Sequence, residues 1–170
     1  AEPSAASLPS AGGSEGGGTV GKACELFCRP GVMGESLCPF VISDGKIIGS
    51  ARAGYLSDMW KGTAYSYFSG SDAVKSALIQ YGNVITVYDV YSDFLYYESG
   101  IYRKTEGASY INRHAVTVVG GGVDNGNVFW ICKNSWGTDW GENGFFRIFE
   151  NECGICAEAI AFTGDVMYNG

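Results

Sequence analysis

Two side chains suited to acid–base chemistry lie twenty residues apart, His114 and Asn134. His114 is the only histidine of the chain and heads the apolar run 115–119. An imidazole can take up and release protons near neutral pH if its ring and tautomer are fixed. The side-chain oxygen of an asparagine can fix both by accepting the N–H of the ring nitrogen that does no chemistry. The pair predicts a general acid/base with its orienting partner; the alternatives are a structural histidine and a turn asparagine.

A tryptophan follows this asparagine by two positions, Trp136, and another stands at Trp140. An indole ring beside a hydrogen-bonded His–Asn pair keeps water from competing for the bond. Trp136 is therefore predicted to shield the pair, with a plain core role as its alternative. For Trp140 a core role is the favoured interpretation.

The spacing of turn and apolar residues explains how the pair can meet. The run 114–119 predicts a buried strand, Asp124-Asn125-Gly126-Asn127 is typical of a hairpin turn, and the run 128–133 predicts a returning strand. Two antiparallel strands joined in this way bring His114 and Asn134 to the same end of the hairpin.

The remaining pattern predicts an α+β fold: a small twisted antiparallel β-sheet or half-barrel with one clear helix. The helix is expected to begin at Ser71 as N-cap and to end at Gly82 as C-cap. Further strands are predicted at 46–48, 63–68, 83–91, 100–102, 145–149 and 159–162, with a short helical turn at 92–97.

The first 21 residues are almost entirely Ala, Gly, Ser, Pro and Glu. Such a segment buries too little apolar surface to offset its ordering entropy, so 1–21 is expected to be a flexible arm or loop and 22–170 the β-rich domain. The start of the chain has no signal-peptide pattern, as expected of a processed chain or an excised fragment.

Composition excludes several classes of partner. A net charge of −7 disfavours nucleic acid and anionic membranes, and no apolar run is long enough to span a bilayer. A single histidine gives little support to a zinc site, so no metal or other cofactor is expected. Six cysteines are compatible with an oxidising compartment.

Several motifs together resemble the second half of papain-like cysteine proteases: His114-Ala115-Val116, Lys133-Asn134-Ser135-Trp136-Gly137, and the run 140–146. Further stretches are similar to the cathepsin B group, namely 24–31, 90–95, 99–102, 122–126 and 153–155. The resemblance covers about residues 22–165 and implies the right-hand, β-rich domain of that fold.

The resemblance also implies roles for individual residues. His114 and Asn134 match the general acid/base and its orienter, and Trp136 matches the residue that shields them. Glu158 matches the acidic residue at the floor of the cathepsin B S2 pocket, and Ala115 a small residue lining the same pocket. A carboxylate there would accept a basic P2 side chain of a peptide substrate; the alternative is a solvated surface glutamate.

The nucleophile is missing from these 170 residues. The papain-type cysteine stands in a Cys-Gly-Ser/Ala-Cys-Trp/Tyr signature roughly 130 to 150 residues before the histidine, and no stretch upstream of His114 has it. Cys153-Gly154-Ile155-Cys156 has a similar spacing but follows the histidine and is not expected to be nucleophilic. Cys132 is expected to be a buried free thiol.

The segment matching the occluding loop of cathepsin B, 1–21, contains no histidine, so the resemblance implies an endopeptidase rather than a dipeptide-trimming enzyme. Three hypotheses follow for the whole. The chain is one half of a two-chain peptidase, with a cysteine-bearing light chain linked through Cys24 while Cys28 pairs with Cys38; or a non-catalytic homologue acting as a binding or scaffold module; or an inactive fragment. The family and the cysteines imply the secretory pathway, with a lysosomal, vacuolar or extracellular destination.

Overall fold

The computed structural model describes residues 18–33, 41–43, 46–48 and 59–169. It divides into two compact units, a first unit of residues 1–65 and 162–170 and a second unit of residues 66–161. Most of the predicted arm, residues 1–17, and Cys38 lie outside the described residues. The division into an arm ending at 21 and one following domain stays a prediction.

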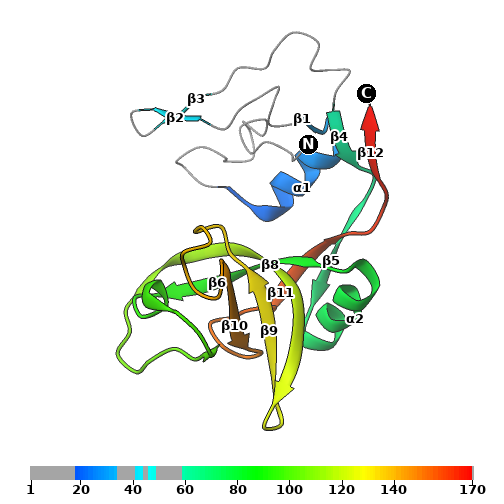
Figure 1. Ribbon diagram of the computed structural model, residues 1–170. Helices are drawn as coiled ribbons and strands as arrows, with labels where there is room; N and C mark the ends of the chain where they lie inside the picture. The colour runs from blue at the N-terminus through cyan, green and yellow to red at the C-terminus, as the bar shows by residue number, and fades with distance from the viewer. Residues whose placement is uncertain (1–17, 34–40, 44–45, 49–58, 170) are drawn as a thin grey trace. The chain divides into compact units, whose positions relative to one another are not determined.

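The second unit is built on most of a seven-stranded sheet with the order β5-β11-β6-β8-β9-β10-β7. Figure 1 labels each of these strands except β7. The bounds are β5 Tyr65–Ser69, β6 Val84–Tyr91, β7 Ile101–Tyr102, β8 Tyr110–Asp124, β9 Asn127–Lys133, β10 Phe145–Phe149 and β11 Glu158–Phe162. The pairings β11–β6, β6–β8, β8–β9 and β9–β10 are antiparallel, whereas β10 and β7 run parallel. The predicted α+β class with a mostly antiparallel sheet is confirmed.

Strand β6 shows why these residues form a half-buried strand. Buried and partly exposed residues alternate along it without exception, and the buried set is Val84, Thr86, Tyr88 and Val90. A period of two places every second side chain on the core face of a sheet. Strand β8 contributes Val116 and Val118 to the same face, so β6 and β8 together provide much of the apolar surface of the core.

The predicted hairpin is present as β8 and β9. Its turn residues Asn125 and Gly126 have φ of 46° and 81°, the left-handed geometry that a two-residue turn of this kind requires. Strand β8 is longer than predicted at both ends, and its register with β9 shifts between Val118 and Gly120. Near the shift, a Cβ added to Gly121 would lie 2.7 Å from the carbonyl oxygen of Phe129, so only glycine fits this close approach.

Helix α2, Ser71–Tyr81, packs its buried residues Val74 and Ala77 into the core. Its C-cap Gly82 is left-handed, as predicted, and donates to the carbonyl of Leu78. The predicted N-cap is wrong by one position: Gly70 is the cap, and Ser71 is the first helical residue. The short turn predicted after β6 is the 3-10 helix η3, Phe94–Tyr96.

The first unit contains a helix that the sequence pattern missed, α1, Val20–Cys28. The expectation of one helix is therefore wrong. Thr19 caps α1 by accepting the N–H of Lys22 at 3.2 Å, but the helix has only nine residues and a glycine in its first turn, a weak helical signal. Also described in this unit are a sheet of β1 Val32–Met33, β4 Met59–Gly62 and β12 Val166–Asn169, and a hairpin of β2 Val41–Ser43 and β3 Lys46–Ile48.

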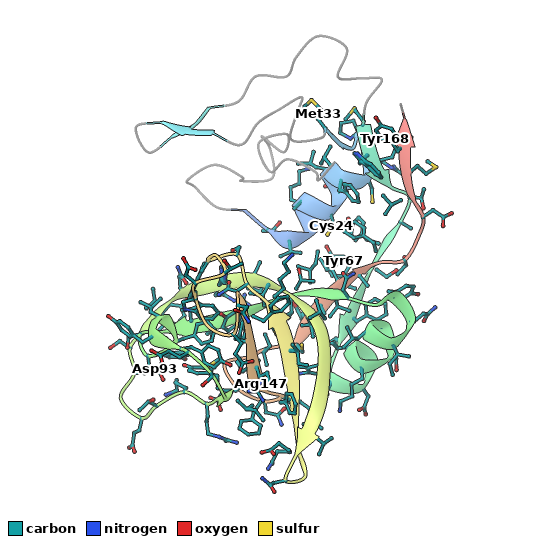
Figure 2. The ribbon with its side chains drawn as sticks, viewed as in Figure 1. Cys24, Met33, Tyr67, Asp93, Arg147 and Tyr168 are labelled. Atoms are coloured by element: carbon teal, nitrogen blue, oxygen red, sulfur yellow. The ribbon has the colours of Figure 1, made fainter. Side chains whose placement is uncertain are left out.

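Two cysteines lie one turn apart on α1, Cys24 and Cys28, with Cys24 labelled in Figure 2. Both are free thiols. Cys38, the predicted partner of Cys28, lies outside the described residues, so that pairing stays a prediction. Burial, with a smaller effect of neighbouring Cys28, raises the pKa of Cys24 to about 11. Within the described part of the chain, no helix is long and apolar enough to cross a membrane.

Candidate active site

The two residues predicted to do the chemistry are in contact. His114 lies on β8 opposite Tyr88 of β6 and is half-buried, and Asn134 follows directly after β9. The distance between Nε2 of His114 and Oδ1 of Asn134 is 2.9 Å. The hairpin brings them together as the sequence predicted, since Thr117 pairs with Lys133 at this end of the two strands.

The backbone fixes the orientation of the Asn134 amide. Its Oδ1 accepts a second hydrogen bond, from the backbone N–H of Ser135 at 2.8 Å, and its own backbone N–H donates to the carbonyl of Gly144 at 2.9 Å. A carbonyl oxygen only accepts, so the ring nitrogen facing it must carry the hydrogen. Nε2 of His114 is thus the donor, which leaves Nδ1 as the nitrogen available to exchange a proton with a reactant.

The indole of Trp136 lies against the imidazole. The ring centroids of Trp136 and His114 are 5.2 Å apart, with a tilt of 30° between the planes. Asn134 itself is 8% exposed. An apolar ring in this position lowers the access of water to the bond, and a hydrogen bond strengthens as its surroundings become less polar.

Trp136 rests on an aromatic group formed by Phe94, Trp140 and Phe146. Its ring centroid lies 5.7 Å from that of Phe94 and 4.9 Å from that of Trp140. Trp140 contacts Phe94 at 5.1 Å and donates its indole N–H to the carbonyl of Leu95 at 3.1 Å. Trp140 is accordingly the support of Trp136 rather than a neighbour of His114.

The two residues predicted to line an S2 pocket share one face of the sheet. Ala115 pairs with Val87 of β6, and the register of β11, with Ala159 opposite Thr86, brings Glu158 beside Val87 from the other side. Thr86 Oγ1 donates to the Glu158 carbonyl at 2.8 Å, which pins the start of β11. Both Ala115 and Glu158 are exposed. Because side chains alternate along a strand, they face away from His114, which is directed to the Tyr88 side.

The cysteines of the second unit lie in surroundings that disfavour the reactive thiolate form. Burial raises the pKa of Cys153 and of Cys156 to about 12, and raises that of fully buried Cys132 well above its ordinary value. A thiol is nucleophilic as its thiolate, and these thiols stay protonated at neutral pH. Among the described residues, the hydrogen-bond partner of the His114 ring is Asn134 and not a thiol. The expectation for Cys132 as a buried free thiol is confirmed.

Three contributors to this site were not predicted. Ser135 supplies the N–H that orients the amide, the ring centroids of Tyr88 and His114 lie 6.2 Å apart, and those of Phe94 and Trp136 lie 5.7 Å apart. The Asn-Ser dipeptide is a signal for the first, because Asn side chains often accept nearby backbone N–H groups. The described residues contain no group of three or more side chains able to hold a metal ion.

Comparisons with known proteins identify the family of the chain. Residues 8–163 match the family model described as "Papain family cysteine protease". Cathepsin B-like CP3 of Giardia intestinalis is 40% identical over 147 residues, covering 84% of this chain and 46% of that protein. Cathepsin B-like cysteine proteinase 5 of Caenorhabditis elegans is 41% identical over 115 residues, covering 66% of this chain and 33% of that protein.

A solved structure is also similar to this chain. The structure of proCathepsin B S9 from Trypanosoma congolense superimposes with a TM-score of 0.81 at 29% identity, covering 96% of this chain and 60% of that one. The chain spans less than half the length of the curated relatives it matches. With its match to the family model extending over most of its length, the chain belongs to the papain family of cysteine proteases.

Proposed function

We propose that this chain supplies the histidine- and asparagine-bearing part of a cathepsin B-like thiol endopeptidase, and that the nucleophilic cysteine comes from polypeptide outside these 170 residues. The observation that carries the proposal is the 2.9 Å contact between His114 Nε2 and Asn134 Oδ1, with a second donor, Ser135 N–H, fixing the amide. This arrangement leaves Nδ1 of His114 as the acid/base atom.

The chemistry assigned to the chain runs through that nitrogen. Nδ1 takes the proton of the cysteine thiol, the thiolate attacks the peptide carbonyl carbon, and the C–N bond breaks as the imidazolium protonates the leaving amine. Water then attacks the thioester while Nδ1 removes its proton, which releases the acid and regenerates the thiol. Asn134 holds the ring during both transfers, and Trp136 keeps water from their bond.

Substrate selection is assigned to Glu158 and Ala115. Their shared exposed face, with Val87 between them, supports a pocket wall in which a small residue leaves room and a carboxylate attracts a basic side chain. The proposed preference is a peptide with arginine or lysine at P2, cleaved internally. A Glu158→Gln variant of the complete enzyme would lose the preference for arginine over an apolar P2 residue.

The cysteine-bearing polypeptide is proposed to be a light chain or N-terminal domain, joined through Cys24 of α1. Cys24 and Cys28 are free here, so either thiol is open to such a bond, although Cys24 is only 2% exposed and would have to pair while the two parts fold together. A disulfide of this kind fits a secretory, lysosomal or extracellular location.

A second candidate is a non-catalytic homologue that uses the fold as a binding or scaffold module. The observation favouring it is that no described cysteine serves as a partner of the His114 ring. An inactive fragment would show the same feature, so the experiment must detect the missing thiol directly.

The test is the intact mass of native material, before and after reduction, following treatment with a peptidyl epoxide that alkylates active-site thiols. The proposal expects a cysteine outside this chain to carry the label, and reduction to release a second polypeptide if Cys24 is bonded to it. The matched control is His114→Ala, which should abolish labelling without changing the mass of the assembly. Unlabelled protein of a single chain would overturn the peptidase proposal and leave the non-catalytic module or fragment.

A further inference from the structure

An ion pair in the second unit joins the loop that carries Trp136 and Trp140 to strand β10. The carboxylate of Glu142 meets the guanidinium of Arg147 on β10 in a two-pronged arrangement, with Nη2 2.6 Å from Oε1 and Nε 3.0 Å from Oε2. Figure 2 labels Arg147. Both side chains are roughly one-third exposed or less, 35% for Arg147 and 26% for Glu142. Bidentate pairs of this kind fix the relative orientation of the two side chains as well as their distance.

The same carboxylate reaches a distant segment of the chain. Oε1 of Glu142 accepts the backbone N–H of Gly100 at 3.0 Å, across a separation of 42 residues. Tyr97 closes the group, because its hydroxyl donates to the Gly100 carbonyl at 2.7 Å and accepts the backbone N–H of Arg147 at 3.1 Å. Glu142 thus joins its loop to β10 and to the 97–100 segment at once.

The loop between Asn134 and Phe145 needs such an anchor. Four of its residues have left-handed φ values, Gly137 at 92°, Gly141 at 57°, Asn143 at 56° and Gly144 at 86°. Three of them are glycines, and glycine loses more conformational freedom on ordering than any other residue. The loop therefore depends on specific contacts to hold one conformation.

A series of backbone hydrogen bonds connects Glu142 to Asn134. The backbone of Glu142 exchanges two hydrogen bonds with Phe145, at 2.9 and 3.1 Å, and Gly144 N–H donates to the Trp140 carbonyl at 2.8 Å. The carbonyl of Gly144 in turn accepts the backbone N–H of Asn134 at 2.9 Å. A displaced Glu142 would release the turn that positions this acceptor.

A second connection runs through side chains. Tyr97 bonds to Gly100 and Arg147 beside Glu142, and its ring centroid lies 5.5 Å from that of Trp140. The ring centroids of Trp140 and Trp136 lie 4.9 Å apart, and those of Trp136 and His114 lie 5.2 Å apart. The Glu142–Arg147 ion pair is therefore connected to both the Gly144 carbonyl that accepts from the Asn134 N–H and the Trp136 ring beside His114.

From these contacts we infer that Glu142, held by Arg147, is a positioning residue for the His114–Asn134 pair, fixing the loop that presents Trp136 and the Gly144 carbonyl. The catalytic meaning of this inference rests on the proposed function, whereas the positioning itself does not.

The test is made on the full chain by NMR. The readouts are the exchange rate of the His114 Nε2–H with water and the cross-relaxation between the His114 and Trp136 rings. In Glu142→Gln, which keeps shape but loses the charge, the Nε2–H is expected to exchange about 2- to 30-fold faster, the range in which network residues modulate a distant contact. The cross-relaxation between the rings is expected to fall.

The matched control is Glu150→Gln, which weakens the 2.9 Å ion pair between Lys75 and Glu150 in the same unit without touching the loop. Its Nε2–H exchange should stay at the wild-type rate even if its melting temperature drops. Arg147→Lys serves as the second variant, because it keeps the positive charge but loses the bidentate contact with Glu142. It should give a rate of Nε2–H exchange between those of wild type and Glu142→Gln.

Equal exchange rates in Glu142→Gln and Glu150→Gln would overturn the inference and leave the ion pair with a role in global stability alone. Failure of the epoxide labelling would overturn the peptidase proposal without touching these NMR results. The two failures are therefore distinguishable.

Discussion

Replacing Asn134 by alanine tests the core of the site on the chain alone. The change removes Oδ1 and with it two hydrogen bonds, from Ser135 N–H at 2.8 Å and from His114 Nε2 at 2.9 Å. The backbone bond from residue 134 to the Gly144 carbonyl, at 2.9 Å, does not involve the side chain and should persist.

The size of the effect follows from the net value of one hydrogen bond. A typical bond contributes about 0.5–1.5 kcal/mol, so the Ser135 amide should lose roughly 2- to 13-fold of its protection against hydrogen exchange. With two bonds lost at an 8% exposed position, the second unit should lose about 1–3 kcal/mol of unfolding free energy.

The assay is amide hydrogen exchange followed by NMR at neutral pH, residue by residue. The amide of residue 134 is the internal control, and Asn112→Ala, at an exposed position of the same strand as His114, is the matched variant. A Ser135 amide that exchanges no faster than in Asn112→Ala would refute the assignment of Oδ1 as its acceptor. Equal acceleration at 134 and 135 would show a collapse of the loop rather than the loss of one acceptor.

Three further predictions concern acid stability, loop geometry and thiol chemistry. Hydrogen bonds from Arg147 outweigh burial and hold the pKa of Glu142 below its ordinary value of 4.5. Since the folded state has the lower pKa, this stabilisation is complete above the ordinary value and is lost as pH falls through the folded one. As pH is lowered from roughly 5 to 3, the urea concentration at the unfolding midpoint should therefore decrease less steeply in Glu142→Gln than in wild type. Identical slopes would contradict the lowered pKa of Glu142. Gly141→Ala places a Cβ 2.7 Å from the Phe145 carbonyl oxygen at a φ of +57°, whereas Gly126→Ala, at +81°, meets nothing within 4 Å. Denaturant unfolding should give a cost at least about 1 kcal/mol greater for Gly141→Ala, and equal costs would contradict the loop geometry. Cys153 and Cys156, with a pKa of about 12 each, should react with a disulfide reagent at pH 7.5 far more slowly in the native than in the urea-unfolded chain. Fast native labelling of Cys153 would reopen it as a nucleophile, and Cys153→Ala would then reduce peptidase activity.

Much of the second unit was predictable because its signals are local. The alternation along β6, the Asn-Gly turn of the β8–β9 hairpin and the glycine ending α2 each act within a few residues. The hairpin alone was enough to predict that His114 and Asn134 meet, since two paired strands need only a register and a turn to set that contact.

Other features gave no usable local signal. Helix α1 is short and begins with glycine in its first turn, so its stability depends on packing that no periodicity reveals. The parallel pairing of β10 with the two-residue strand β7 joins segments more than forty residues apart. The N-cap at Gly70 instead of Ser71 reflects a preference that either residue satisfies.

By itself, the sequence determined the types of chemistry available and the pair proposed to carry it: one histidine, one asparagine placed to orient it, and no cysteine signature before them. Tertiary structure alone decided which nitrogen of the His114 ring holds the proton, because Ser135 orients the Asn134 amide. It also decided how the loop between Asn134 and Phe145 is held, through the contacts of Glu142 with Arg147 and Gly100. The physical reason is range. Turn and alternation preferences act between neighbours along the chain, whereas a hydrogen bond spanning 42 residues exists only once the sheet has brought its ends together.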